Sequence, residues 1–227
     1  MADVIIFDID GTLLDSVDLH AKAWHEAFRH FGYDFPYDRV RSQIGKGGDQ
    51  LLPYFLSEQE VAEKGEALKK FRSDLFKTKY LSQVKPFPGV RQLFQKIKDN
   101  GQRTALASSA KGDELGTFEN IANIHDLVDQ GVSSADASKS KPHPDIFEAA
   151  LDKLGGNVDR SNVVVVGDSP HDAEGARKAG LRVIGVLCGG FSEQDLRAAG
   201  CEAVYSGPEE LLQRFEKTLL AKRAKSG

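Results

Sequence analysis

Short apolar runs alternate with amphipathic stretches along most of the chain. The first run, residues 4–7 (Val-Ile-Ile-Phe), is apolar at every position, which predicts a strand buried on both faces, as in a parallel sheet. Similar runs predict further strands at residues 104–107, 127–132, 163–166, 183–187 and 203–205. Apolar residues at helical spacing predict helices at residues 90–97, 146–154, 173–179, 196–199 and 208–220. Strands that alternate with helices in this order indicate an α/β fold, a doubly wound parallel sheet with helices on both faces.

A long helical stretch separates the first predicted strand from the rest of this alternation. Apolar residues recur at the spacing of a helix face in residues 17–31, with Ser16 as the expected helix cap, and again in residues 58–76. The Pro-Phe-Pro-Gly run at residues 86–89 ends the stretch. The ends of such an insert can lie close together, because closing a long loop costs little more than closing a short one. We therefore expect two domains, a core of residues 1–15 and 86–227 and a small helical domain of residues 16–85.

Two aspartates, Asp8 and Asp10, follow the first predicted strand, and a glycine and a threonine come next. They lie just outside the carboxyl end of a strand, where open α/β sheets bind ligands. Carboxylates this close repel each other unless a cation lies between them or one of them binds a proton. Mg²⁺ prefers oxygen ligands and suits such a pair. A polar turn without any ligand has the same local pattern, so the residues downstream must decide between the two interpretations.

Two later positions could supply groups that bind phosphate. Ser108 and Ser109 follow the strand predicted at residues 104–107 and precede a helix, where hydroxyl and backbone N–H groups can hold an anion. A serine-rich loop has the same pattern without any ligand. Lys141 stands in a Lys-Pro-His-Pro run, whose two prolines restrict the backbone. This makes Lys141 a better candidate for a fixed positive charge than Lys139.

A third acidic position follows the four-valine strand, in the run Gly-Asp-Ser-Pro-His-Asp at residues 167–172. We expect Ser169 to cap the next helix, with Asp172 in the first turn near the positive end of the helix dipole. That role accounts for Asp172 but not for Asp168. The pattern therefore predicts that Asp168 completes a metal site with Asp8 and Asp10.

Composition narrows the classes of function. The net charge of −4 argues against a protein that binds nucleic acid or a membrane surface, and no apolar run approaches the roughly 18 residues of a membrane span. The first apolar run is too short for the core of a signal peptide. Two cysteines, Cys188 and Cys201, predict neither a disulfide framework nor a zinc site, and indicate reduced thiols. We expect a cytoplasmic monomer or weak dimer whose partner is a small molecule.

Taken in order, these motifs resemble those of a known family, the haloacid dehalogenase-like (HAD) hydrolases. The run Asp-Ile-Asp-Gly-Thr-Leu-Leu-Asp-Ser at residues 8–16 is similar to the first motif of the family. The serines after the second core strand, the lysine before a helix and the Gly-Asp-Ser-x-x-Asp run resemble the other three. The predicted helical insert is similar to the cap of the family's phosphoglucomutase-like branch. The resemblance therefore covers essentially the whole chain.

The resemblance implies how the first two aspartates act. Asp8 would be the nucleophile that forms an aspartyl-phosphate. Asp10 would be the general acid and base and would give its backbone carbonyl to Mg²⁺. A free aspartate has a pKa of about 3.9. We therefore expect the site to raise the pKa of Asp10, since this carboxyl must first donate a proton.

The resemblance also implies roles for the later motifs. Ser108, with Ser109 beside it, would bind the transferring phosphoryl group, and Lys141 would neutralise its charge. Asp168 would bind Mg²⁺, and Asp172 would support the metal shell. These roles suit phosphoryl transfer, because its transition state carries dispersed negative charge that cations and oriented donors stabilise.

The predicted function is a Mg²⁺-dependent phosphatase acting on a small phosphorylated metabolite, with a sugar phosphate as one candidate. An isomerase of the β-phosphoglucomutase kind is the alternative, since His20 matches a histidine in the cap of that branch. Residues 45–50 lack the arginine that such mutases place on the distal phosphate, although Lys46 could replace its charge. His20 also fits an ordinary half-buried helix histidine, and Lys46 a solvated turn. A non-catalytic phosphate-sensing module is a third class, which the full set of catalytic residue types disfavours.

Overall fold

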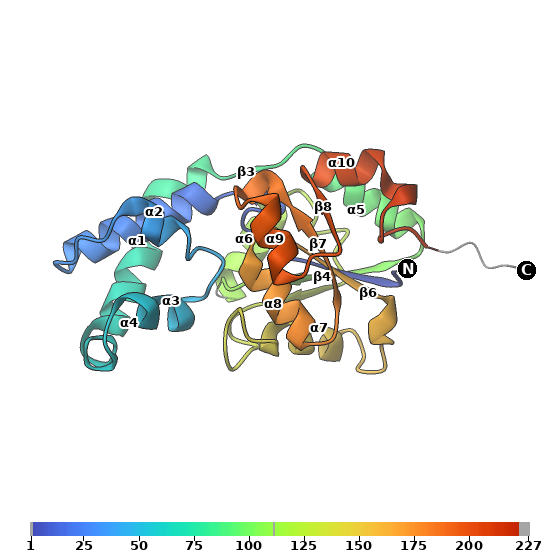
Figure 1. The fold of residues 1–227 in the computed structure, drawn as a ribbon. Coiled ribbons are helices and arrows are strands. Elements are labelled where there is room, and N and C mark those ends of the chain that lie inside the picture. The colour runs from blue at the N-terminus through green and yellow to red at the C-terminus, as the bar shows by residue number, and fades with distance from the viewer. Residues whose placement is uncertain (1, 111, 223–227) are drawn as a thin grey trace, which may run out of the picture.

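The computed structural model describes residues 2–110 and 112–222, without the side chains of residues 112 and 113. Within these residues, six parallel strands form the main sheet in the order β5-β4-β1-β6-β7-β8 (Figure 1). Their bounds are β1 Val4–Phe7, β4 Arg103–Ala107, β5 Gln130–Val132, β6 Val163–Gly167, β7 Arg182–Val186 and β8 Ala203–Tyr205. The doubly wound α/β fold predicted from the sequence is confirmed.

Helices cover both faces of this sheet, and Figure 1 shows α5 and α10 on the side opposite α7. Their bounds are α5 Val90–Asp99, α6 Gly112–Ile121, α7 Asp145–Lys153, α8 Pro170–Lys178, α9 Glu193–Ala199 and α10 Pro208–Gln213. The alternation along β1 explains this arrangement, because Ile5 and Phe7 pack in the hydrophobic cluster with α5, whereas Val4 and Ile6 pack in the cluster with α7. In the described part of the chain, no helix is both long and apolar enough to cross a membrane.

The segment between β2 (Leu14–Asp15) and β3 (Lys85–Pro86), which we call the helical insert, lies beside the sheet (Figure 1). It has a hydrophobic cluster of its own. Its elements are α1 Val17–His30, α2 Tyr37–Arg41, α3 Gly48–Phe55 and α4 Glu58–Leu75, then a π-helical turn Phe76–Tyr80 and a 3₁₀ turn Leu81–Gln83. The two short strands β2 Leu14–Asp15 and β3 Lys85–Pro86 pair antiparallel and hold the two ends of the insert together. The insert therefore stands beside the sheet on a narrow two-stranded connection.

Two predicted elements are much longer than the elements found in the structure. The strand expected at residues 127–132 covers only β5, because the carbonyl of Leu127 and the carboxylate of Asp129 accept hydrogen bonds from Thr104 in place of strand pairing. The helix expected at residues 208–220 ends with α10. The Thr218 hydroxyl donates to the carbonyl of Phe215 and forms a local turn there.

The strand order brings the three polar motifs to one place. β1 pairs with β4 on one side and β6 on the other, in a register that sets Phe7 against Leu106 and Val166. The residues that follow these three strands therefore emerge next to one another at the carboxyl edge of the sheet, where the strand order reverses.

Candidate active site

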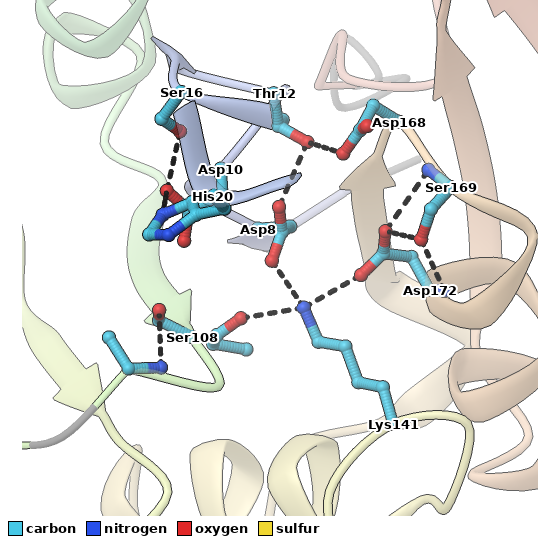
Figure 2. Close-up of polar contacts among 12 residues, drawn as sticks. Asp8, Asp10, Thr12, Ser16, His20, Ser108, Lys141, Asp168, Ser169 and Asp172 are labelled. Atoms are coloured by element: carbon cyan, nitrogen blue, oxygen red, sulfur yellow. Dashed lines mark hydrogen bonds and ion pairs between the residues drawn. The ribbon is translucent and has the colours of Figure 1, made fainter. Parts of the chain in front are cut away.

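Lys141 lies at the bottom of the site and contacts three oxygen atoms (Figure 2). Its side chain is fully buried, and its Nζ pairs with Asp8, with Asp172 at 2.7 Å and with the carbonyl of Ala107 at 2.9 Å. A buried ammonium is stable only when it is paired and hydrogen-bonded, and Nζ donates to Asp8 and to the Ala107 carbonyl while Asp172 pairs with it as a counter-charge. The structure thus places Lys141 in the interior, in contact with the first motif.

Thr12 connects the first motif to Asp168. Its Oγ1 lies 3.3 Å from Asp8 Oδ2 and 3.1 Å from Asp168 Oδ1 (Figure 2). The approach depends on Gly11, whose φ is +85° and where an added Cβ would lie 2.3 Å from Asp168 Oδ2. The Asp-Gly-Thr run is therefore required for packing against Asp168 as well as for the turn.

Three carboxylates lie at the buried bottom of the site, which we call the floor. Oxygen atoms of Asp8, Asp168 and Asp172 lie within 4.8 Å of one another. When all three are ionised, the single ammonium of Lys141 leaves an excess of two negative charges. A divalent cation would balance that excess, and carboxylate oxygens are the ligands that Mg²⁺ accepts. The donor set therefore fits a divalent metal.

The pKa values in the floor reflect this excess of negative charge. Burial raises the pKa of Asp8 to about 7; the negative charges of Asp172 and Asp10 add to this rise, and Lys141 only partly offsets it. Burial and the charges of Asp172 and Asp8 also hold the pKa of Asp168 well above its ordinary value. Burial would lower the pKa of Lys141, but the charges of Asp172 and Asp8 raise it. Each shift has the direction expected for a cluster that lacks positive charge.

Asp172 does more than the sequence predicted. The expected cap is confirmed, since Ser169 Oγ accepts from the N–H of Asp172 at 3.3 Å and Asp172 Oδ2 accepts from the N–H of Ser169 at 3.1 Å. The other carboxylate oxygen, Oδ1, faces Lys141. Asp172, rather than the carboxylate of Asp10, is the third member of the cluster with Asp8 and Asp168.

The carboxylate of Asp10 turns toward the helical insert. Its Oδ1 accepts from Ser16 Oγ at 2.5 Å and from His20 Nε2 at 2.8 Å (Figure 2), and among the described residues no donor reaches Oδ2. Burial alone would raise the pKa of Asp10. Hydrogen bonds from His20 and Ser16, together with the charge of Arg72, instead lower the pKa of Asp10 to about 2. The expectation of a raised pKa for Asp10 is therefore wrong for the free protein.

His20 transmits the effect of a further residue, Arg72, to Asp10. Arg72 Nη2 lies 2.6 Å from His20 Nδ1, and a guanidinium can only donate. Nδ1 must then accept, so the ring proton sits on Nε2 and is donated to Asp10. The His20 ring also stacks on Phe76, with centroids 4.0 Å apart. His20 is thus both a packed helix histidine and a hydrogen-bond donor to Asp10.

Ser108 and Ser109 differ in their surroundings. Ser108 is buried, and its Oγ accepts from the N–H of Ala110 at 3.1 Å, which leaves the hydroxyl proton to donate. Ser109 Oγ is buried and has no hydrogen-bond partner among the residues that the structure describes, and Ser109 lines the pocket above Asp8. Of the two, Ser109 has the hydroxyl whose hydrogen-bonding capacity is unused.

A pocket lies between the sheet edge and the helical insert. Asp8 and Asp10 line it from the core, and Lys46 and Arg72 from the insert. Lys46 is not a solvated side chain on a turn, since its Nζ donates to Gln43 Oε1 at 2.6 Å and lies 5.0 Å from the ring centroid of Tyr54. Asp8 and Asp10 therefore line this pocket, Lys141 lies beneath Asp8, and both predicted insert residues, His20 and Lys46, border it.

Sequence reasoning missed Arg72. This residue stands midway between Leu68 and Phe76, four residues from each, on the stripe by which α4 and the following turn bury their apolar side chains. A charged residue on a buried stripe is the signal that could have identified it. Ser16 was predicted only as a helix cap, but its hydroxyl donates to Asp10 instead.

Comparison with known proteins agrees with this geometry. The family profile described as haloacid dehalogenase-like hydrolase matches residues 5–186. The chain is 28% identical over 218 residues to a phosphorylated carbohydrates phosphatase of Thermotoga maritima, covering 96% of this chain and all of that protein. It is 26% identical over 219 residues to a phosphoglycolate phosphatase of Nitrosospira multiformis, covering 94% and 96%.

A solved structure shows the same fold. The crystal structure of a hydrolase from Pseudomonas syringae superimposes with a TM-score of 0.85 at 27% identity, covering 94% of this chain and 98% of the other. Sequence motifs, strand order and the residues gathered at the carboxyl edge of the sheet all agree with the profile match. The chain belongs to the haloacid dehalogenase-like hydrolases.

Proposed function

We propose that the protein is a Mg²⁺-dependent phosphatase that hydrolyses a small phosphorylated metabolite through an aspartyl-phosphate on Asp8. The observation that carries this proposal is the buried floor, in which three carboxylates face a single ammonium directly below a pocket. Relatives named for the hydrolysis of phosphorylated carbohydrates and of phosphoglycolate support the reaction class.

In the first proposed step, a carboxylate oxygen of Asp8 bonds to phosphorus while the bond from phosphorus to the ester oxygen breaks. Asp10 donates a proton to the departing oxygen. In the second step, Asp10 takes a proton from water, the water oxygen bonds to phosphorus, and the bond to Asp8 breaks to release phosphate. Covalent catalysis of this kind divides one difficult displacement into two easier ones.

Asp10 must therefore change protonation state during the cycle. Its pKa of about 2 in the free protein suits the second step, in which it is a base. The negative charge of a bound phosphate ester would raise the pKa of Asp10, as a nearby like charge does, and would favour the acid form needed for the first step. His20 and Ser16 would hold Oδ1 throughout and leave Oδ2 to face the reacting oxygen.

Asp8, Asp168 and the backbone carbonyl of Asp10 would hold the metal, with Asp172 supporting the shell. When bound, Mg²⁺ would neutralise charge on the transferring phosphoryl group. Lys141 would contribute a second fixed positive charge, and Ser108 and Ser109 would donate hydrogen bonds to phosphoryl oxygens.

We also propose that residues 16–85 act as a cap domain that covers this site, with residues 1–15 and 86–227 as the core. The narrow β2–β3 connection and the separate hydrophobic cluster of the insert support this division. Cys188 and Cys201 are both free thiols, which fits the proposed cytoplasmic location. A monomer or weak dimer remains the proposed state.

An isomerase of the β-phosphoglucomutase kind is the second candidate. It is favoured by the hydrogen bond from His20 to Asp10 and by Arg72, an arginine of the insert beside the pocket, where residues 45–50 offer only a lysine. In such an enzyme the phosphoryl group would return to another hydroxyl of the substrate instead of passing to water.

One experiment separates these functions. The purified protein is incubated with a panel of phosphorylated metabolites and Mg²⁺, and both phosphate release and sugar-phosphate isomerisation are followed. We expect phosphate release that stops with EDTA and returns with excess Mg²⁺. Isomerisation without phosphate release would favour the mutase, and no turnover of any compound would favour a phosphate-sensing module.

A further inference from the structure

Two cations border the pocket and have only neutral partners. Arg72 Nη2 donates to the neutral Nδ1 of His20, and its guanidinium carbon lies 5.2 Å and 5.4 Å from the ring centroids of Trp24 and Phe76. Lys46 Nζ donates to the amide oxygen of Gln43. In the described part of the chain, no carboxylate forms an ion pair with either cation.

Other cations of the insert are neutralised locally. Arg41 pairs with Asp18 at 2.6 Å, and Lys69 pairs with Glu66 at 2.5 Å. Two carboxylates act electrostatically on Arg72 without pairing with it: Glu114, which lines the same pocket, and Asp10, which lies across the His20 ring. Glu114 accepts from Ser73 at 3.2 Å and pairs with Lys77 at 3.3 Å, so its charge is already compensated.

Leaving two such cations without a directly paired carboxylate is costly. Both are half-buried, and Arg72 Nε is buried with no hydrogen-bond partner among the described residues. A desolvated cation is stable when an anion replaces the lost water, and a guanidinium is suited to a carboxylate because two of its N–H groups can bind the two oxygens. The end of the pocket formed by the insert therefore carries excess positive charge, which an anionic ligand would neutralise.

The position of Arg72 restricts where such an anion can lie. One nitrogen of the His20 ring bonds Asp10, and the other bonds Arg72. Asp10 is proposed to meet the ester oxygen of the substrate, so Arg72 is separated from that oxygen by the Asp10 carboxylate and the His20 ring. An anionic group that reaches Arg72 must therefore be close to the ester oxygen along the substrate chain.

We propose that Arg72 and Lys46 form a second anion-binding subsite, and that the preferred substrates are short phosphorylated hydroxy acids whose carboxylate binds there. The inference rests on the proposed phosphatase function and adds the substrate class. It also gives the helical insert a defined task, which is to select the part of the substrate that does not react.

The competing substrate class is a neutral sugar phosphate. A second cavity of about 280 Å³ adjoins the pocket, with Trp24 and Arg72 bordering both, and Ser134, Ser138 and Ser140 line its far side. Sugar hydroxyls could bind these serines. The two classes differ in what Arg72 contributes, because only an acid requires its charge.

The test uses substrate pairs that differ only in the carboxylate. One pair is 2-phosphoglycolate and 2-hydroxyethyl phosphate; the other is 3-phosphoglycerate and glycerol 3-phosphate. Glucose 6-phosphate represents the sugars, and kcat/KM is measured for each with saturating Mg²⁺. We expect the acid of each pair to be preferred by at least about 10-fold, as is typical when a charged group is paired.

Variants then test which residues cause the preference for the acid of each pair. Arg72→Gln is expected to reduce the ratio of acid to alcohol about 10-fold or more, Arg72→Lys to keep part of it, and Lys46→Ala to reduce it by about 3- to 10-fold. The matched control is Lys70→Ala, which removes an exposed cation from the same helix and should leave the ratio unchanged. Ratios are informative even though Arg72 also holds His20, because loss of that contact slows both members of a pair.

The outcomes separate the two proposals. Equal kcat/KM for acid and alcohol in the unmodified protein, or a preference for glucose 6-phosphate, would overturn the subsite while leaving the phosphatase in place. If Arg72→Gln and Lys46→Ala slowed every substrate by one common factor, both residues would act on the chemistry or the fold, and the subsite would again be wrong. Absence of hydrolysis for all five esters would instead refute the proposed function itself.

Discussion

The floor of the site and the part of the helical insert that faces it, which we call the roof, carry excess charge of opposite sign. In the floor, Lys141 is buried against two carboxylates, and Thr12 and Ser169 add hydrogen bonds to the acidic cluster. In the roof, Arg72 and Lys46 are held by a histidine, an amide and aromatic rings. A metal cation would balance the excess negative charge of the floor, and an anionic group of the substrate would balance the excess positive charge of the roof.

The two regions also differ in what holds their residues in place. Floor residues stand at the ends of adjacent hydrogen-bonded strands, so their spacing follows from the sheet register. Roof residues come from α4 and from the loop before α3, in an insert whose side chains contact the core through hydrogen bonds from several elements. Examples are the hydrogen bond from the N–H of Ser140 to Asp49 at 3.1 Å and that from Arg41 to the carbonyl of Gly189 at 3.2 Å. We expect substitutions in the floor to affect the reaction and those in the roof to affect selection.

The largest effect is expected for the nucleophile. Asp8→Asn should reduce turnover by at least about 10⁴-fold on every substrate, because an amide is a very poor nucleophile. Asp10→Asn should slow each chemical step by about 10²–10⁴-fold but keep the nucleophile. Steady-state rates and trapping of an acid-labile phosphoenzyme measure both. Near-normal turnover by Asp8→Asn would exclude the covalent mechanism.

The next effect concerns the metal. Asp168→Asn should increase the Mg²⁺ concentration needed for half-maximal activity by at least about 10-fold, since it removes a charged oxygen from the cluster. The residue is buried, so the isosteric amide is preferable to alanine, and a melting curve checks the fold. Asp152→Asn, an exposed aspartate on α7, is the control. An unchanged Mg²⁺ requirement would remove Asp168 from the metal site.

A smaller effect is expected where roof and floor meet. Asp49 accepts from the N–H of Ser140, the residue before Lys141, and Gly47 packs so closely that an added Cβ would lie 2.1 Å from Ser140 Oγ. Asp49→Ala should lower kcat/KM about 10-fold, or about 1.4 kcal/mol, because the insert then loses a contact with the lysine loop. Asp49→Asn keeps an acceptor oxygen and should lose less. Equal losses would show that charge, not the hydrogen bond, matters.

The smallest effect concerns stability in the absence of metal. The folded-state pKa of Asp8, about 7, lies above its ordinary value of 3.8, so the folded protein binds more protons than the unfolded chain between these values. Its contribution to stability is therefore present at low pH and is lost as pH rises to about 7. In EDTA, the Tm of Asp8→Asn should rise relative to the unmodified protein by a few degrees between about pH 4.5 and 7.5. A difference that does not vary with pH would contradict the raised pKa.

The sequence by itself determined the elements of the floor. An apolar run such as residues 4–7 becomes a buried strand in any α/β sheet, and the polar residue after it must then lie at the carboxyl edge. The Ser169 cap was predictable for the same reason, since it depends on residues three positions apart. Each of these inferences needs only local backbone preference and the periodicity of side chains.

Tertiary structure alone decided which side chains meet. The pattern of two aspartates suggested that both carboxylates join a metal site, whereas the family resemblance implied only the backbone carbonyl of Asp10. In the structure Ser16 and His20 bind the Asp10 carboxylate, and Asp172 is the third carboxylate of the cluster. The low pKa of Asp10 follows from those neighbours and not from its own motif. Arg72 has a helical position that the sequence shows, but its contact with His20, fifty-two residues earlier, depends on how α4 packs against α1. Periodicity sets the face on which a side chain lies, whereas the packing of distant elements sets its partner, its charge state and therefore its chemistry.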